Sequence, residues 1–257
     1  MKNSLANMRA RREEILRFLD SGEKTIKCIS AHVHVSELTV RRDLFSLSEE
    51  GLIIKKHGSA CCKGDEGLEG FSAKGGKNTY QKKAIAVEAA KFIFPGETVF
   101  INAGTTTLEV IKCLLDKPIT IVTNNAEALA LVHLESKAKI LCTGGEYNAR
   151  NKSFSGQLAT ALVDIMYAQT CILGINGFDV ESGLTTSFYP ETMINKDFIR
   201  RTAGKKIIIA DSSKCGKTKS FQSASWNQID VFITDWLIDD ATITSIRNKG
   251  VETIIAR

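Results

Sequence analysis

The strongest constraint on the fold is a repeated pattern in residues 82–257, where an apolar strand, a small polar turn and a helix alternate. Strands are predicted in the segments ETVFI, ITIV, KILC, QTCILGI, KKIIIA and DVFITD, and helices in AIAVEAAKFI, TTLEVIKCLL and AEALALVHLE. Strands that alternate with helices pair in parallel, because each helix carries the chain back across the sheet. The pattern predicts an α/β domain with a doubly wound, mainly parallel sheet.

Polar turns follow the strands of this predicted sheet. Ligands of such folds bind at the carboxyl ends of the strands, so these turns are candidate binding residues. In the first turn, a glycine, three hydroxyls and a helix N-terminus can hold a phosphate. Each turn taken singly is also an ordinary cap or turn former, but five turns on one edge favour a ligand site. The five turns are Asn102 to Thr107, Thr123 to Asn125, Thr143 to Gly145, Asn176 to Asp179, and Asp211 to Lys214.

The excess positive charge lies entirely in the N-terminal third of the chain. Residues 1–83 contain 16 Lys and Arg against 11 Asp and Glu, whereas residues 84–257 contain 18 of each, so the first segment carries the whole net charge of +5. Lysine and arginine gain affinity for nucleic acids by releasing counterions from the phosphates. This uneven distribution of charge favours a polyanion-binding module joined to a neutral domain. On charge alone, a solvated basic surface is an equally good explanation.

Three helices are predicted within the basic segment. The first covers residues 9–20, the second lies within residues 24–36, and the third begins after Ser36, whose hydroxyl can cap the first turn. In the third helix the buried stripe consists of Val40, Leu44 and Leu47, and the opposite face carries Glu37, Thr39, Arg41, Arg42 and Ser46. A short helix, a tight turn and a second helix with a polar, arginine-bearing face form the helix-turn-helix arrangement.

Arg41 and Arg42 are the candidate nucleic-acid contacts of the third helix. A planar guanidinium can bind a phosphate, or the O6 and N7 atoms of guanine, through two hydrogen bonds. The alternative is a solvated helix face with a salt bridge to Asp43 or Glu49.

A hairpin is predicted directly after the third helix, in the segment LIIKKHGSACC. Two short strands would flank His57 and Gly58. The basic residues Lys55, Lys56 and His57 would then contact the DNA backbone or the minor groove as a wing.

The stretch VSELTVRRDLFSLSEEGLIIKKHGSA closely resembles the DeoR family of repressors, in which V-S-x-x-T-[IV]-R-R-D-L forms the recognition helix and H-G-G forms the wing turn. Ser59 departs from this pattern, since the family usually has a second glycine there. The resemblance implies DNA-facing positions at Ser36, Thr39, Arg41 and Arg42, with Lys55, Lys56 and His57 on the wing. Glu37, on the same helix face, is predicted to join them.

Residues 82–257 resemble the DeoR-family sensor domain, which is similar in turn to ribose-5-phosphate isomerase and the coenzyme A transferases. The resemblance implies that the polar turns surround a phosphorylated sugar or a related metabolite. The predicted effector-binding residues are Gly104, Thr105, Thr106, Thr107, Thr123, Asn124, Gly177, Asp179, Glu191, Lys196 and Lys214. We expect a winged helix-turn-helix in residues 1–62, a linker in 63–81 and an effector-sensing α/β domain in 82–257. Such a chain would repress a carbohydrate catabolic operon until the effector binds.

An active sugar-phosphate isomerase with an accessory head is the main alternative. The isomerases carry a D-G-A-D turn where this chain has Asn176 to Asp179, so one acid of the pair is missing. Without both carboxylates, proton transfer between adjacent carbons lacks an acid or a base, and we expect binding without turnover. A third candidate, an RNA-binding metabolic protein, would need aromatic stacking residues that the basic head lacks.

The remaining sequence features limit the possible cofactors, cellular location and assembly of the protein. The seven cysteines are scattered without a C-x-x-C pair, so no metal or cofactor is predicted, and Cys113, Cys142 and Cys171 are expected to be small core residues. No apolar run is long enough to cross a bilayer and no secretory leader is recognisable, so a cytoplasmic location is expected. Palindromic operators bound by helix-turn-helix proteins favour a homodimer or homotetramer on double-stranded DNA.

Overall fold

The computed structural model describes residues 8, 11, 12, 14, 15, 18, 19, 24–49, 53–56, 58–62 and 71–257. They form parts of two compact units, residues 1–77 and residues 78–257. His57 and residues 63–70 of the predicted linker lie outside the described residues, as do the side chains of Glu49, Lys56, Cys61 and Cys62.

The N-terminal unit contains the predicted helix-turn-helix. Helix α2 (Ile26–His32) begins after Thr25, whose hydroxyl accepts a hydrogen bond from the Cys28 amide, and α3 spans Glu37–Glu49. Four residues join the two helices. Ser36 caps α3 as predicted, because its hydroxyl oxygen accepts from the Thr39 amide at 3.3 Å.

The core of this unit is formed by the apolar stripes of its helices. Ile29 of α2 and Val40, Leu44 and Leu47 of α3 are all buried, and Ile15 and Leu19, which are also helical, join the same cluster. The predicted third-helix stripe is therefore confirmed, and burying it leaves the opposite face of α3 in solvent.

A three-stranded antiparallel sheet forms the wing. Strands β2 (Ile53–Lys56) and β3 (Ser59–Cys62) form the predicted hairpin, and β1 (Lys24–Thr25) pairs with the other edge of β3. Gly58 takes the positive φ of 84° that the two-residue turn requires. Ser59 pairs with Lys56 as the first residue of β3, so the turn forms without a second glycine.

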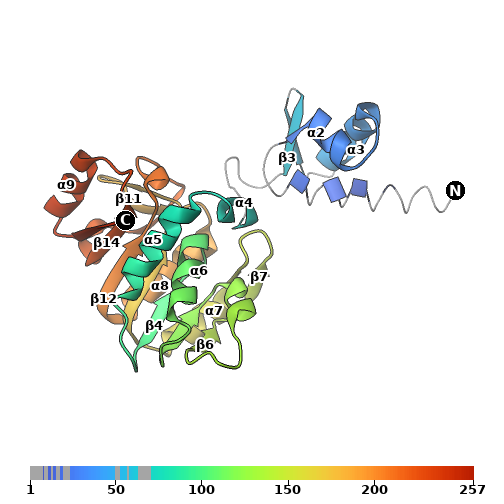
Figure 1. Cartoon of the computed structure of the whole chain (residues 1–257). Helices are drawn as coiled ribbons and strands as arrows, with labels where there is room; N and C mark the ends of the chain where they lie inside the picture. Colours follow the sequence, from blue (N-terminus) through green and yellow to red (C-terminus); the bar gives the residue numbers. More distant parts are fainter. Residues whose placement is uncertain are drawn as a thin grey trace. The chain divides into compact units, whose positions relative to one another are not determined.

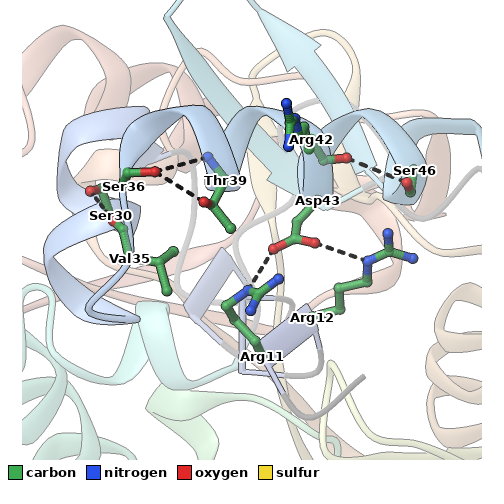
Figure 2. Close-up of polar contacts among 9 residues, drawn as sticks. All are labelled: Arg11, Arg12, Ser30, Val35, Ser36, Thr39, Arg42, Asp43 and Ser46. Atoms are coloured by element: carbon green, nitrogen blue, oxygen red, sulfur yellow. Dashed lines mark hydrogen bonds and ion pairs between the residues drawn. The ribbon is translucent and has the colours of Figure 1, made fainter. Parts of the chain in front are cut away.

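A buried carboxylate joins α3 to the N-terminal segment. Asp43 accepts from Nε of Arg11 at 2.7 Å and from Nε of Arg12 at 3.2 Å, and its side chain is only 4% exposed. Figure 2 shows both arginines approaching Asp43 from one side of α3, while Arg42 points to the other side. Asp43, one of the two salt-bridge partners that the solvated-face alternative named, is therefore engaged elsewhere, and the side chain of the other, Glu49, lies outside the described residues.

The C-terminal unit is built on a seven-stranded sheet in the order β15-β14-β12-β9-β4-β5-β6, and every adjacent pair is parallel. These strands are β4 (Thr98–Ile101), β5 (Thr120–Thr123), β6 (Lys139–Cys142), β9 (Ala168–Gly174), β12 (Thr202–Ile209), β14 (Val231–Asp235) and β15 (Glu252–Ala256). The fold-class prediction, a winged helix-turn-helix followed by a doubly wound parallel sheet, is confirmed.

Helices cover both faces of this sheet. On one face α5 (Thr79–Ala90) and α6 (Thr105–Leu114) lie side by side (Figure 1). Their apolar residues pack with Val99 and Ile101 of β4, whereas the intervening Phe100 belongs to the core of the other face. That second core includes residues of α7 (Gln157–Asp164), α8 (Tyr189–Arg200) and α9 (Asp240–Asn248).

Shorter elements extend from the sheet near its carboxyl edge. The hairpin of β7 (Glu146–Asn148) and β8 (Ser153–Ser155) precedes α7, and a small antiparallel sheet contains β10 (Gly177–Asp179), β11 (Gly183–Thr186) and β13 (Phe221–Ala224). Single-turn 3₁₀ helices occupy Ser212–Lys214 (η2) and Trp226–Gln228 (η3). The helix α4 (Phe71–Gly75) lies within the predicted linker.

Two local predictions were wrong. The helix expected over AEALALVHLE is only a 3₁₀ helix, η1 (Ala126–Leu131), because Leu129 and Leu134 point to solvent and only Ala128 is buried in it. Cys113 is exposed, since α6 turns its neighbours Ile111 and Leu114 inward. Cys171 is buried as expected, and burial raises the pKa of its thiol to about 11.

Substitution of Asp43 by asparagine tests the contribution of the carboxylate to the head. The change keeps the shape but removes the charge that two guanidinium groups contact, which should cost about 2 kcal/mol. Hydrogen exchange of α3 peptides in the full chain should then be about 30-fold faster, since 1.4 kcal/mol is a factor of ten. Glu37→Gln, at an exposed acid on the same helix, is the control; equal exchange rates in the two variants would contradict the assignment.

Candidate functional site

The exposed face of α3 is the candidate DNA-binding surface. Glu37, Arg41 and Arg42 are exposed on it, and neither arginine forms an ion pair within the described part of the chain. Ser36 and Thr39 share a hydrogen bond of 2.9 Å between their hydroxyls, so both stabilise the start of the helix (Figure 2). The two arginines therefore have their full donor capacity available for an external acceptor.

Of the basic residues predicted for the wing hairpin, Lys55 is the one whose side chain is described. Lys55 of β2 is exposed, and its Nζ lies 5.2 Å from the ring centre of Phe45 on α3. This cation–π contact places the lysine beside α3. Lys56 is placed by its backbone alone, and His57 stays a prediction outside the described residues.

The second candidate site lies at the carboxyl edge of the parallel sheet. The chain runs from β4 outward through β5 and β6, and later from β9 outward through β12, β14 and β15, so the strand order reverses between β4 and β9. Ligands of doubly wound sheets bind in the crevice at this reversal.

Asn102 joins the two strands at the reversal. Its Oδ1 accepts from the Gly174 amide and its Nδ2 donates to the Gly174 carbonyl, both at 2.8 Å, and Nδ2 also donates to Oδ1 of Asn195 on α8. The side chain is buried, so these bonds replace all of its contact with water. Asn102 therefore fixes the edge on which the predicted turns lie.

The predicted threonines at this edge divide into two groups. The hydroxyl of Thr107 donates to the Asn102 carbonyl at 2.7 Å, and that of Thr123 accepts from the Asn125 amide at 3.0 Å, so both shape the turns themselves. No hydrogen bond in the described structure involves the hydroxyls of Thr105 or Thr106. These two begin α6 directly after Gly104, and no side chain caps that helix.

Neighbouring turns are joined to the first by asparagine side chains. Asn124 accepts from the Ala103 amide at 2.7 Å and donates to the Phe154 carbonyl, while Asn125 donates to the Gly104 carbonyl. The loops after β4 and β5 and the strand β8 are therefore held together around the N-terminus of α6.

Gly177 brings two further predicted turns together. A Cβ at this position would lie 2.0 Å from the Lys217 carbonyl oxygen, so only glycine permits the approach. The next residue, Phe178, forms a backbone bridge with Cys215. Lys214 is half-buried in the adjacent η2 and forms no ion pair with any described residue.

The two predicted effector-binding residues of α8, Glu191 and Lys196, lie on different sides of the helix. Glu191 lies one turn before Asn195, on the same side, and accepts from Asn151 Nδ2 at 3.0 Å. Lys196 is exposed, about 100° around the helix from Asn195. The structure thus brings Glu191, but not Lys196, toward the edge that Asn102 organises.

Asp179 has a local role in the β10–β11 hairpin. Its Oδ1 accepts from the amides of Glu181 and Ser182 at 2.9 and 3.0 Å. The backbone hydrogen bonds from Ser182 and Glu181 lower the pKa of this carboxyl. Asn176 accepts from the Ser187 amide, so the NGFD turn contains one amide and one turn-forming acid rather than a carboxylate pair.

Three residues at this edge were missed by the sequence analysis. Ser153 and Ser187 have buried hydroxyls without a hydrogen-bond partner in the described structure. Asn78, at the start of α5, donates to Asp211 Oδ1 at 2.8 Å and to Ser213 Oγ at 3.2 Å. Lone serines and asparagines are too common in loops for spacing to identify them. Asn78 directly precedes the observed α5, but the sequence predicted this helix only from Ala84, so no signal pointed to it.

Within the described residues no cluster of three or more His, Cys, Asp or Glu is arranged to hold a metal ion. None of the described helices is long and apolar enough to cross a membrane.

The two units together define a regulator with a DNA-binding head and a ligand-binding body. Residues 11–63 match the DeoR-like helix-turn-helix domain, and residues 77–236 match the DeoR C terminal sensor domain. The chain belongs to the DeoR family of transcriptional regulators.

Named relatives cover nearly the whole chain. The HTH-type transcriptional regulator GlpR of Haloferax volcanii is 34% identical over 236 residues, which cover 91% of this chain and 92% of GlpR. The glycerol-3-phosphate regulon repressor of Escherichia coli is 29% identical and covers 79% of this chain and 81% of its own length. These relatives confirm the prediction of a regulator rather than an enzyme.

One solved structure of D-ribose-5-phosphate isomerase, in complex with phospho-erythronic acid, matches 53% of this chain and 54% of its own at 21% identity and a TM-score of 0.39.

Replacing Arg41 and Arg42 by alanine tests the candidate DNA-binding surface. Each arginine contact with a base or phosphate is worth about 1–3 kcal/mol, so the double variant should lose about 100-fold or more in operator affinity. Fluorescence anisotropy with a labelled operator duplex at fixed salt measures the loss. Lys139→Ala, at an exposed lysine of β6, should bind like the wild type; wild-type affinity in the arginine double variant would remove α3 as the recognition helix.

Proposed function

We propose that this protein is a transcriptional repressor of a carbohydrate catabolic operon, released from its operator by a phosphorylated sugar or a related metabolite. The observation that supports the effector class is the N-terminus of α6, where Thr105 and Thr106 carry free hydroxyls at the strand-order reversal. The repressor acts in the cytoplasm as a homodimer or homotetramer on double-stranded DNA, because a palindromic operator requires two heads.

A phosphate suits the chemistry of the α6 N-terminus. The first amides of a helix have no intrahelical acceptor and carry a partial positive charge, and α6 has no side-chain cap to satisfy them. Thr105 and Thr106 add two hydroxyl donors. We assign the phosphate to this position, with Lys214 as the cation that neutralises it.

The sugar moiety is assigned to the buried hydroxyls beside this position. Ser153 pairs through its backbone with Asn125, and Ser187 donates its amide to Asn176, so each belongs to a turn of the same edge. A buried hydroxyl without a partner costs about 1–3 kcal/mol, and the hydroxyls of a polyol would supply the missing hydrogen bonds. Glu191, half-buried on α8, is the acceptor for a further sugar hydroxyl.

Relatives support this effector class by name. The E. coli relative is named as the glycerol-3-phosphate regulon repressor, and another E. coli relative, 29% identical over 250 residues, is named as a putative aga operon transcriptional repressor. A small phosphorylated polyol is therefore the first effector to test.

The route from effector to DNA passes through Asn78. This residue stands where the chain enters the sensor unit, in a left-handed conformation with φ of 52°, and its amide contacts Asp211 and Ser213 in the turn that carries Lys214. An effector that moves Lys214 would displace the same turn. Linkage then requires that the effector bind the DNA-free state more tightly.

Titration of a gel shift with phosphorylated effectors tests the proposed function. The labelled duplex is the upstream region of the protein's own operon, and the probes are glycerol 3-phosphate and the monophosphates of common pentoses and hexoses. Each is compared with its unphosphorylated form. At least one phosphorylated probe should release the duplex; a protein that binds no upstream duplex, or releases it to none of the probes, is not this repressor.

The variants Thr106→Val and Lys214→Ala test the phosphate position. Each removes one donor to a charged group, so the effector Kd should rise about tenfold, while operator affinity without effector stays unchanged. Calorimetric titration with the active probe measures the effector Kd. Thr98→Val, at the opposite end of β4, is the matched control; equal Kd values in all three proteins would place the phosphate elsewhere.

Asn78→Gly tests the coupling route. Glycine keeps the left-handed backbone but removes the amide that contacts Asp211 and Ser213. We expect the effector to bind with unchanged Kd, while the ratio of operator Kd with and without effector falls about fivefold or more. Asn248→Gly, at the exposed end of α9, is the control. A wild-type ratio in Asn78→Gly would show that the signal leaves the site by another path.

A further inference from the structure

The exposed face of α3 carries two large apolar side chains as well as the two arginines. Leu38 is 61% exposed and Phe45 is 58% exposed. Residues 38, 41, 42 and 45 are spaced at i, i+3, i+4 and i+7, so they share one face of the helix. This face is apolar at both ends and cationic in the middle.

Phe45 already has a partner within the domain. The ammonium group of Lys55 lies 5.2 Å from its ring centre, so the ring positions the wing lysine relative to α3. Its place in the third turn of α3 also puts it far from the helix N-terminus. Phe45 thus has a structural reason for its exposure.

Leu38 has no comparable role. It lies in the first turn of α3, away from the stripe of Val40, Leu44 and Leu47 that packs against the rest of the head. In helix-turn-helix complexes the N-terminal residues of the recognition helix are the ones that contact base edges in the major groove. Leu38 therefore occupies a base-reading position with a side chain that can form no hydrogen bond.

The major groove offers one apolar group to such a side chain, the C5-methyl of thymine. The charge of the same face fits that occupant, because Arg41 and Arg42 have no ion-pair partner among the described residues and DNA would supply phosphates or guanines to both. We propose that Leu38 is a specificity-determining residue that packs on a thymine methyl group in each operator half-site. The proposal rests on the assignment of α3 as the recognition helix.

The test uses thymine-to-uracil exchange, which removes the methyl group and keeps every hydrogen-bonding atom of the base pair. Duplexes are first selected from a random library with the full-length protein, and each thymine of the selected operator is then replaced singly by deoxyuridine. Fluorescence anisotropy gives the Kd of each duplex for the wild type, Leu38→Ala and Leu129→Ala, the last being a leucine of η1 that is 54% exposed.

One thymine per half-site should stand out. Replacing this thymine by uracil should raise the Kd of the wild type and of Leu129→Ala about fourfold. This factor corresponds to the free energy of burying one methyl group. Leu38→Ala should bind the thymine operator more weakly and show no further loss with uracil there. Leu38→Gln, which keeps the length but adds a polar end, should also lose the methyl sensitivity, and matching thermal melts check the fold of both variants.

Three other results would overturn the proposal. If uracil weakens DNA binding by Leu38→Ala and by the wild type equally at every position, or weakens neither, Leu38 contacts no thymine methyl group. In either case the Arg41 and Arg42 double variant still reports whether α3 binds DNA. If the selection enriches no duplex, both the recognition-helix assignment and this proposal fail.

Discussion

The sensor unit depends on the three hydrogen bonds of Asn102. This buried amide joins the carboxyl ends of β4 and β9, the two strands between which the chain reverses its direction of winding, and connects both to α8. A parallel sheet leaves the backbone groups at this edge without strand partners, so some polar side chain must satisfy them. Because Asn102 does so from inside, the outer turns need not supply these hydrogen bonds.

The polar groups of that edge therefore belong to two populations. One is satisfied internally and gives the turns their shape, as the hydroxyls of Thr107 and Thr123 do. The other is left with unused capacity: the hydroxyls of Ser153 and Ser187 are buried without a hydrogen-bond partner in the described structure. A rigid frame with a few unsatisfied donors is what a small polar ligand requires, since the frame is already ordered before the ligand arrives.

The period of the apolar residues predicted the parallel sheet and the helix-turn-helix, because burial of a stripe or a strand leaves a direct trace in the sequence. The same periods placed Arg41 and Arg42 opposite the buried stripe of their helix and placed the polar turns directly after the apolar strands. Side-chain partners leave no such trace: nothing in the local sequence shows that Asp43 pairs with Arg11 and Arg12, or that Asn78 contacts Asp211 across more than a hundred residues. The short η1 was mispredicted because apolar residues there are exposed.

The burial of Asp43 has a consequence for how fast the protein finds DNA. Residues one and two apart on a helix do not share a face, so the acid directly after the two arginines points away from them. Here the carboxylate is held on the opposite side of α3 by Arg11 and Arg12 (Figure 2). Neither arginine of this face has an ion-pair partner among the described residues, so an anionic partner would have no internal salt bridge to break, and its association would depend on ionic strength.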